Sequence, residues 1–495
     1  MPGETKHADV RCRRHGNPDV SDDTLLDQSA IELSRAIHAR DVSCREVMLA
    51  TLRRVDAVNP RVNAIVARVD AESLLAQADA RDAQLSSGRS LGWLHGMPQA
   101  FKDTTPVAGM VTTSGSPLLA DFVPKQDSVM VARMRAAGCI VIGRSNVPEF
   151  ALGSHTFNSV HGSTVNAFDP TKSAGGSSGG AAVALATRML AVADGSDFMG
   201  SLRNPAAWNN VFGLRPSQGR VPHWPVQDAW IAQLGTEGPM ARNVPDLARL
   251  LAIQAGWDAR APLSIAEDGR QFEQALDSDP AGVRIGWLGD LDGHLAMEPG
   301  ILELCERALS RLQGRGCKVD RARLGMPPER VWECWLAWRR ALVGARIAPF
   351  LLDPRNRARI KEEALWEYDQ GRSLTGADLL AASATRTLVH QRMLALFEDY
   401  DVLALPSAQC WPFDASLRWP AEIAGRPMDT YHRWMEVTIL ATLAGLPAIS
   451  VPVGFGDAGL PMGMQLIGRP RDDLGVLRLA MHVEPWASPA HDLPA

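Results

Sequence analysis

Residues 173–205 read SAGGSSGGAAVALATRMLAVADGSDFMGSLRNP, and the interpretation of the whole chain follows from this stretch. Two clusters of small residues, GGSSGG at 175–180 and GSDFMGS at 195–201, flank a segment rich in alanine and leucine. That segment, residues 181–193, contains no helix breaker, so it predicts a buried helix that runs into a strand. Glycine lacks Cβ and lets backbone N–H groups face an open space. The pattern therefore predicts two loops that can bring two serines together.

The rest of the chain alternates helix and strand patterns, which predicts an α/β fold. Two capping boxes, Ser29 with Glu32 and Ser43 with Glu46, predict two helices, and Pro60 is expected to end the second. The other expected elements are a strand at 63–67, helices at 71–85 and 127–137, a strand at 139–143, a strand–helix–strand unit at 283–324, a mostly helical segment at 327–400, and strands at 401–406, 445–452 and 459–468. We predict a single large domain with a mixed, mostly parallel, twisted central sheet that helices cover on both faces.

The chain shows no repeat, no low-complexity linker and no convincing internal boundary. We expect a polar N-terminal tail over residues 1–22 and one domain over residues 23–490. Within this domain the core motifs fall at about 90–250, a helical insertion at about 327–400, and the C-terminal strands at about 401–470.

The composition excludes several classes of protein. Of the 495 residues, 46% are apolar and 22% are charged, which is typical of a soluble globular protein. A net charge of −5 gives no reason to expect nucleic acid or an anionic membrane as a partner. The seven cysteines form no C-x-x-C pair, so a zinc or redox motif is not indicated, and scattered thiols fit a reducing compartment. The first twenty residues lack the apolar core of a signal peptide, and no apolar run approaches the roughly 18–20 residues that span a bilayer. We predict a cytoplasmic protein.

A lysine ends one of the expected buried strands. Residues 94–103, LHGMPQAFKD, form a mostly apolar segment that reaches Lys102. Burial disfavours the ammonium form of lysine. From this segment alone, Lys102 is either a surface lysine whose stem lies along apolar residues or a buried amine with a lowered pKa.

Three kinds of chemistry fit a loop rich in glycine and serine. A phosphate loop would need G-x-x-x-x-G-K-[ST], but Lys172 precedes the glycines. An α/β-hydrolase nucleophile elbow matches G-x-S-x-G at residues 175–179. However, the preceding residues 168–173 are polar and interrupted by proline, and the late histidines, His432, His482 and His491, lie in no recognisable context. In the third interpretation a neutral lysine is the base, and one serine relays a proton from another.

With its two serine loops and Lys102, the chain resembles the amidase signature family of Ser–Ser–Lys amide hydrolases. The resemblance rests on motifs that occur in order over roughly residues 25–470: LHGMP at 94–98 with Lys102-Asp103, the two glycine-rich clusters through Pro205, GLRPS at 213–217, GPMAR at 238–242 and the C-terminal Gly-Leu-Pro segments. It implies the amidase signature fold, and it implies a hydrolase that needs no cofactor and no metal.

The resemblance also implies a role for each matching residue. Ser201 corresponds to the nucleophile, Ser177 to a bridging serine that follows a cis peptide bond, and Lys102 to the general base and later proton donor. The oxyanion hole is expected from the backbone N–H groups of Phe198, Met199, Gly200 and Ser201. Supporting roles fall to Ser178, a hydroxyl beside the relay, and to Asp197 with Arg203, which shape the nucleophile loop.

One departure from the family bears on the substrate. Family members usually carry two glycines before the nucleophile, whereas here the pair is Met199-Gly200. We expect an apolar, aryl or alkyl pocket formed by Met199, Trp332, Trp335, Trp338, Trp411, Tyr431 and Trp434. The alternative is that these aromatic residues are core and lid, which is common for tryptophans spaced by three residues in a helix.

The expected reaction is hydrolysis of a linear carboxylic amide to an acid and an amine or ammonia. The same acyl chemistry would serve a carbamate, an ester or a cyclic amide. Less favoured alternatives are an A-type amidotransferase component, an α/β-hydrolase and a non-catalytic binding member of the family. The expected partner is a small-molecule amide or carbamate, with no nucleic acid and no membrane, and a homodimer is compatible with this function.

Overall fold

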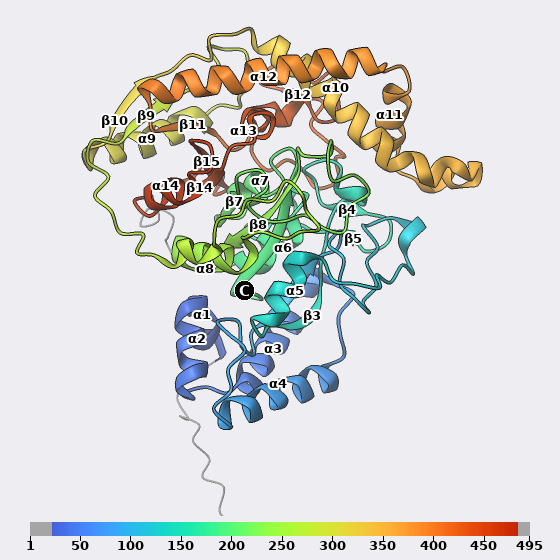
Figure 1. Ribbon diagram of the computed structural model, residues 1–495, viewed down its shortest axis with the longest axis vertical. Helices are drawn as coiled ribbons and strands as arrows, with labels where there is room; N and C mark the ends of the chain where they lie inside the picture. Colours follow the sequence, from blue (N-terminus) through green and yellow to red (C-terminus); the bar gives the residue numbers. More distant parts are fainter. Residues whose placement is uncertain (1–21, 484–495) are drawn as a thin grey trace, which may run out of the picture.

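The structure is a computed structural model of the chain, and it describes residues 22–483. The N-terminal helices lie at one end, a large sheet runs through the middle, and a helical layer with the long helix α12 (Gly376–Asp399) lies at the other end (Figure 1). The predicted tail and His491 fall outside the described residues, apart from position 22. No helix in the described range is long and apolar enough to cross a membrane.

The central sheet has eight strands. Their order is β10 (Lys318–Arg321), β9 (Arg284–Trp287), β11 (Val402–Pro406), β15 (Pro461–Gly468), β14 (Ala448–Phe455), β7 (Phe212–Arg215), β8 (Thr236–Ala241) and β6 (Val192–Asp197). Only the pairs β10–β9 and β9–β11 are parallel, and the other five neighbouring pairs are antiparallel. The prediction of a mixed sheet is confirmed, but "mostly parallel" is wrong. A short link such as residues 456–460 between β14 and β15 can join only antiparallel strands.

A smaller sheet contains Lys102, the lysine predicted to end a buried strand. Its strands are ordered β1 (Ile65–Val66), β3 (Ile140–Ser145) and β2 (Pro98–Lys102), with β2 parallel to β3. The strand β2 lies against β6 of the large sheet, where the backbone N–H of Lys102 donates to Asp194 Oδ2 at 3.2 Å. The two sheets therefore meet at the end of β2.

The helices follow the sequence closely. They are α1 (Asp22–Asp27), α2 (Ala30–Ala39), α3 (Cys44–Val62), α4 (Ala71–Ser86), α5 (Val129–Ala136), α6 (Gly179–Ala186), α7 (Arg203–Trp208), α8 (Val244–Gln254), α9 (Ile301–Gly314), α10 (Pro328–Ile347), α11 (Glu362–Gly371), α12, α13 (Ile439–Ala444) and α14 (Asp473–Ala480). Both predicted capping boxes, at Ser29 and Ser43, are present. Pro60 does not end its helix as predicted: α3 continues to Val62 and ends at Asn63, which adopts the left-handed conformation (φ 51°).

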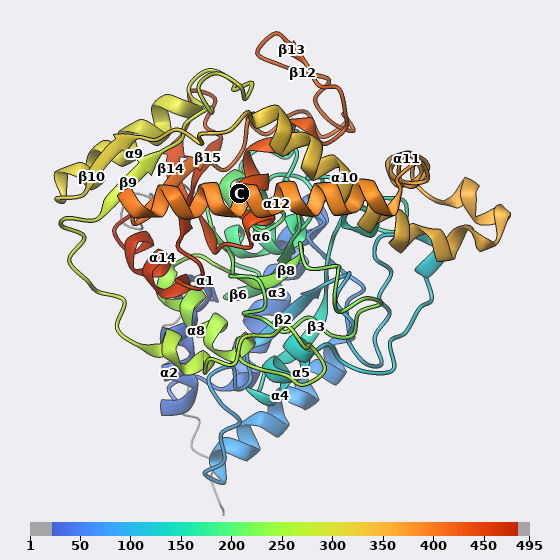
Figure 2. The ribbon, with the colours of Figure 1, turned by 45° about the horizontal axis from the view of Figure 1, so that its top comes forward.

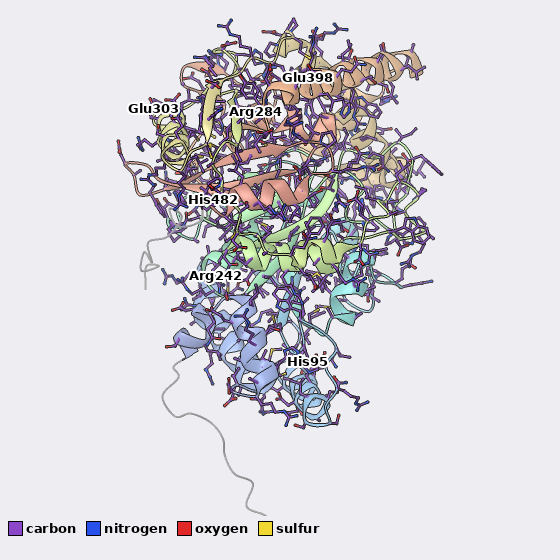
Figure 3. All side chains as sticks on the ribbon, turned by 60° about the vertical axis from the view of Figure 1, so that its left-hand side comes forward. His95, Arg242, Arg284, Glu303, Glu398 and His482 are labelled. Carbon is purple, nitrogen blue, oxygen red and sulfur yellow. The ribbon has the colours of Figure 1, made fainter. Side chains whose placement is uncertain are left out.

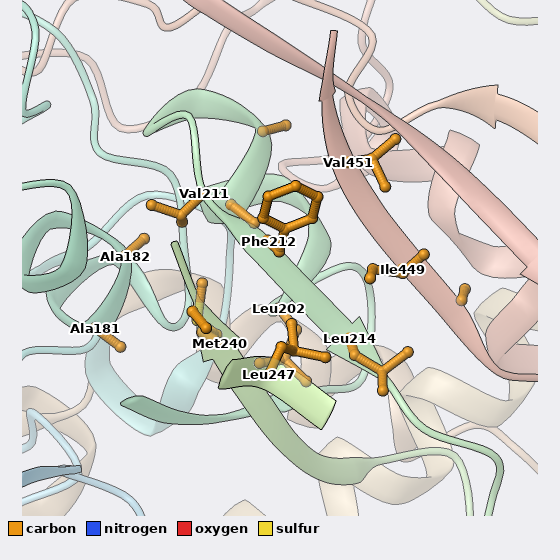
Figure 4. Close-up of a cluster of buried hydrophobic side chains, with 14 of the residues drawn as sticks. Ala181, Ala182, Leu202, Val211, Phe212, Leu214, Met240, Leu247, Ile449 and Val451 are labelled. Atoms are coloured by element: carbon orange, nitrogen blue, oxygen red, sulfur yellow. The ribbon is translucent and has the colours of Figure 1, made fainter. Parts of the chain in front are cut away.

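Helices α6 and α7 pack on the large sheet and hold the two serine loops. The predicted buried helix that runs into a strand is confirmed as α6 followed by β6. Ala181 and Ala182 of α6 lie beside Val211, Phe212 and Met240, all of them buried (Figure 4). Small side chains on α6 let the helix approach the sheet closely, so the serine just before the helix is held on a rigid element.

An arginine at the end of the large sheet contacts the N-terminal helices. Arg242, which follows β8, donates to the carbonyl of Leu190 at 2.9 Å and to the carbonyls of Leu26 and Gln28 at 3.2 and 2.7 Å. It lies between the N-terminal helices and the sheet (Figure 3). The predicted helical segment over 327–400 is confirmed as α10, α11 and α12, and α12 runs along the outside of the molecule (Figure 2). The six described cysteines are free and buried, and Cys12 lies outside the described residues.

Candidate active site

Two loops, one before α6 and one after β6, hold the serines. Ser177 follows a cis peptide bond after Gly176, as expected, and Ser201 lies between β6 and α7. The backbone N–H of Ser178 donates to the carbonyl of Ser201 at 3.2 Å. A Cβ on Gly195 would come within 2.7 Å of Ser178 Oγ, which explains the glycine there. The two loops are therefore packed directly against each other.

Lys102 reaches these loops from the end of β2. Its side chain is 0% exposed, and Nζ lies 2.8 Å from Ser177 Oγ, 2.8 Å from Ser178 Oγ and 2.9 Å from Ser196 Oγ. An ammonium group offers three N–H donors, whereas a neutral amine offers two and a lone pair that accepts. Because three hydroxyls surround Nζ, both protonation states find partners. The geometry lets Lys102 either give a proton to Ser177 or take one from it.

The protonation of Lys102 is set by opposing effects. Burial lowers the pKa of Lys102 to about 7, because it disfavours the ammonium form. The carboxyls of Asp194, Asp197 and Glu237 act in the opposite direction, and the guanidinium of Arg346 adds to the lowering. A large fraction of the amine is therefore neutral near neutral pH. Burial also decides between the two interpretations of this lysine, since it is not a surface residue.

Asp197 holds the backbone of the nucleophile loop. Its carboxylate accepts two hydrogen bonds from Arg203, both 3.0 Å, and one each from the N–H groups of Gly200 (2.9 Å) and Leu202 (3.2 Å). Its carbonyl oxygen accepts from Arg215 Nη1 at 2.6 Å. Burial by itself would raise the pKa of Asp197, but the two guanidinium groups and the N–H donors hold that pKa well below its usual range. This geometry agrees with the expectation that Asp197 and Arg203 shape the loop.

We expect the Asp197→Asn variant to lose about 3–5 kcal/mol of unfolding free energy, because it leaves two buried guanidinium groups without their carboxylate. Urea-induced unfolding followed by circular dichroism measures this loss. The matched control is Asp79→Asn, which breaks an exposed ion pair with Arg45 (2.6 Å) and should change the free energy by less than about 1 kcal/mol. Equal stability of the two variants would contradict the structural role of Asp197.

Of the four backbone N–H groups expected to form the oxyanion hole, three are free in the described structure to bind a substrate oxygen. The N–H groups of Phe198, Met199 and Ser201 find no acceptor within residues 22–483, so they are available to a substrate oxygen. The Gly200 N–H departs from the expectation, because it already donates to Asp197. An aspartate side chain commonly accepts a hydrogen bond from a backbone N–H two or three residues further on, and this competes with the predicted role of Gly200.

The structure also shows why a side chain fits at position 199 and not at 200. Gly200 has φ +79°, and a Cβ there would lie 2.6 Å from a methyl carbon of Thr438. Met199 is not among the residues with positive φ, and its buried side chain receives a contact from Arg339 Nη1 to Sδ at 3.8 Å. The departure from the family pattern therefore places a thioether beside the nucleophile loop without backbone strain.

Only some of the predicted aromatic residues reach the nucleophile loop. The ring of Trp335 lies 5.2 Å from that of Phe198, between centroids, and the guanidinium of Arg339 lies over both rings. Trp332 packs on His432, and Trp338 is covered by Arg386, so these two tryptophans belong to the core around α10. Trp434 stacks on Trp208 of α7, and Trp411 donates to the carbonyl of Pro299.

Tyr431 is in contact, through Arg339, with Met199 of the nucleophile loop and also lines a cavity. Its hydroxyl donates to Glu367 Oε1 at 2.9 Å and accepts from Arg339 Nη2 at 2.5 Å, and Arg339 in turn contacts Met199. Tyr431 also lines a cavity of about 300 Å³ together with Trp366, Trp419 and Met428. Tyr431 is thus the one predicted pocket residue that links an aromatic cavity to Met199.

Three polar residues next to Lys102 were not predicted from the sequence. They are Ser196, whose hydroxyl lies 2.9 Å from Nζ, and two buried carboxyl residues, Asp194 and Glu237. Ser196 and Asp194 could have been found, because polar residues at positions 194 and 196 of a strand place both side chains on one face. Glu237 carried no such signal, because its neighbours depend on how β8 pairs with β6.

Comparisons with known proteins identify the family of the chain. The family model Amidase matches residues 46–477. The acylamidase of Rhodococcus erythropolis is 34% identical over 468 residues, which cover 93% of this chain and 96% of that protein. The A component of the glutamyl-tRNA(Gln) amidotransferase of Cyanothece sp. is 34% identical over 487 residues, covering 93% and 98%.

The structural comparison points to the same group. The crystal structure of a bacterial aryl acylamidase of the amidase signature enzymes superposes with a TM-score of 0.87 and 29% identity, covering 93% of this chain and 96% of that one. The fold, the motifs and these similarities all define the same class of protein, an α/β enzyme with a mixed sheet that acts on amides. The chain belongs to the amidase signature family.

Proposed function

We propose that the protein hydrolyses linear carboxylic amides through an acyl-enzyme on Ser201. Neutral Lys102 takes a proton from Ser177, which takes the proton of Ser201 as that hydroxyl attacks the carbonyl carbon. The N–H groups of Phe198, Met199 and Ser201 stabilise the oxyanion, and each donor of this kind is worth about 2.7–4 kcal/mol. The proton returns through Ser177 to the leaving amine, and water then attacks the acyl-enzyme by the same relay.

One observation carries this proposal: a fully buried lysine amine lies 2.8 Å from Ser177 Oγ, in a loop packed against the loop of Ser201. The low pKa of that amine supports its role as a base. The hydroxyl of Ser201 makes no hydrogen bond within the described residues, and its side chain is 6% exposed, so it is free to act on a substrate.

We further propose that the preferred acyl or amine group is apolar and aromatic. The nucleophile loop presents Phe198 and Met199, and Trp335 of the helical insertion packs on Phe198. Tyr431, which Arg339 joins to Met199, also lines a cavity with Trp366 and Trp419. The likeness to an acylamidase and to an aryl acylamidase favours the same substrate class.

A second candidate is release of ammonia from glutamine, which the likeness to the A component of amidotransferases favours. The bulky, apolar residues at 198 and 199 speak against it, because the amide and charged groups of glutamine would lose hydrogen bonds to water there. Carbamates and esters remain compatible with the same site, because their carbonyl carbons undergo the same attack.

A substrate panel tests this proposal. We expect para-nitroacetanilide to be hydrolysed with a kcat/KM at least about 10-fold above that for glutamine, which corresponds to about 1.4 kcal/mol of transition-state binding. An ester and a carbamate with the same aryl group complete the panel. Preference for glutamine would reverse the assignment.

A matched pair of variants tests the aromatic pocket in the same assay. Trp335→Leu should raise KM for the aryl amide by about 5-fold or more, because it removes the contact with Phe198. Trp332→Leu, in the same helix and also buried, serves as the control and should leave KM within about twofold. Equal changes in KM for the two variants would remove Trp335 from the pocket.

A further inference from the structure

Two buried carboxyl residues, Asp194 and Glu237, lie beside Lys102 and have no part in the reaction described above. Asp194 and Ser196 are two residues apart on β6, so their side chains lie on one face of the strand. Ser196 stands directly opposite Glu237 of β8, which places Glu237 on the same face and diagonal to Asp194. Lys102 contacts this face through Ser196 Oγ and through its backbone bond to Asp194.

Within residues 22–483, neither carboxyl forms an ion pair. Among the described residues, Asp194 accepts from neutral donors, Gln99 Nε2 and the Lys102 N–H, both at 3.2 Å, and Glu237 Oε2 is buried without a hydrogen-bond partner. The guanidinium of Arg144 lies in the same region but is paired with Asp103, with Nε 3.4 Å from Oδ1. Two neighbouring carboxyls that are buried without ion pairs cannot both ionise at reasonable cost.

The charges around the pair decide which carboxyl keeps its proton. Burial raises the pKa of Asp194 to about 6, although the hydrogen bond from the Lys102 N–H and the charges of Arg144 and Lys102 act in the opposite direction. Burial, together with the charge of Asp194, raises the pKa of Glu237 to about 8. The remaining charged groups that act on Lys102 are Asp197, which two arginines neutralise, and Arg346 of α10. Both shifts favour a single negative charge on the pair near neutral pH, on Asp194 rather than on Glu237.

We propose that Asp194 and Glu237 act as one positioning pair, which keeps a single negative charge beside Lys102 and stabilises the ammonium ion formed when Lys102 takes the proton of Ser177. In that step the O–H bond of Ser177 breaks and an N–H bond forms on Nζ, while the pair neither gains nor loses a proton. The proposal rests on Lys102 being the base. The proposal also explains why Glu237 is present. If Asp194 is made neutral, Glu237 loses its like-charged neighbour and can ionise in its place.

The first test compares the variants Asp194→Asn and Glu237→Gln with the double variant, using para-nitroacetanilide. We expect each single variant to lose only about 2–5-fold in kcat, because one carboxyl still carries the charge. The double variant should lose about 100-fold or more, well beyond the product of the single effects. Its acid limb in kcat/KM should also move down by about one pH unit or more, since removing negative charge lowers the pKa of Lys102.

Multiplicative effects of the two substitutions, with the acid limb unmoved, would overturn the proposal. Thermal unfolding of each variant reports whether the fold survives, because the asparagine cannot satisfy both donors that Asp194 accepts.

An infrared measurement tests the shared charge without relying on activity. The spectrum of the wild-type protein minus that of Glu237→Gln should show a protonated carboxyl band at neutral pH. This band should be absent from the spectrum of Asp194→Asn minus that of the double variant, because Glu237 is then ionised. No such band in the wild type, or a band that persists in Asp194→Asn, contradicts the proposal. If Ser201→Ala kept its activity, the proposed function would fail, whereas the infrared result would still decide the state of the pair.

Discussion

Replacing Ser201 by alanine is expected to lower kcat for amide hydrolysis by at least about 10⁴-fold, as removal of a nucleophile does in other serine hydrolases. The loss should be this large because no other hydroxyl lies between β6 and α7, the segment that contains the free N–H groups of Phe198, Met199 and Ser201. Alanine keeps the backbone of the loop, so the hydrogen bonds of Asp197 that shape it should remain.

The control for this variant is Ser163→Ala, which removes an exposed serine on β5 (Gly162–Ser163). It should keep full activity. Unfolding curves of the two variants should agree with that of the wild type, since the Ser201 side chain makes no hydrogen bond in the described structure. Residual activity of Ser201→Ala above about one per cent of wild type would exclude Ser201 as the nucleophile.

Replacing Lys102 by methionine is expected to have the second largest effect, a loss of about 10²–10⁴-fold in kcat, the range typical of general acid–base catalysis. Methionine has a similar length and is apolar, so it fits the buried position better than a charged residue would. It leaves the hydroxyls of Ser177, Ser178 and Ser196 without their shared partner, and the unfolding free energy should fall as well.

The pH dependence separates a catalytic from a structural effect at this lysine. The neutral amine is the active form, so kcat/KM of the wild type should rise as pH increases through about 7 and level off above it. In Lys102→Met this limb should disappear. Lys125→Met, at an exposed position, serves as the control and should keep the wild-type profile. A limb that survives in Lys102→Met would assign the titration to another group.

Much of the fold could be predicted because its signals are local. The capping boxes at Ser29 and Ser43, the run of alanines before β6 and the paired C-terminal strands all depend on residues close in sequence. Strand direction depends instead on distant pairing and on the links between strands. The predicted helix–strand alternation suggested parallel crossovers, whereas the short link at 456–460 and the pairing of β7 with β14 make most of the sheet antiparallel.

The candidate site divides in the same way. Ser177, Ser201 and Lys102 lie in recognisable motifs, so the sequence could name them as candidates. The buried carboxyls could not be found, because Glu237 faces Lys102 only through the register of β8 against β6. Too many aromatic residues were assigned to the pocket, for a related reason. Of the three tryptophans on α10, only Trp335 forms a ring contact with Phe198 in the described structure. Helical spacing alone does not tell which turn of a helix faces the site.

The most direct test of the account is to trap the acyl group during turnover. The enzyme is mixed with para-nitroacetanilide, quenched in acid and analysed by intact mass and peptide mapping. We predict one acetyl group on the peptide that carries Ser201, and none in Ser201→Ala. An acetyl group on Ser177 or on any other residue, or steady turnover by Ser201→Ala, would contradict the central claim.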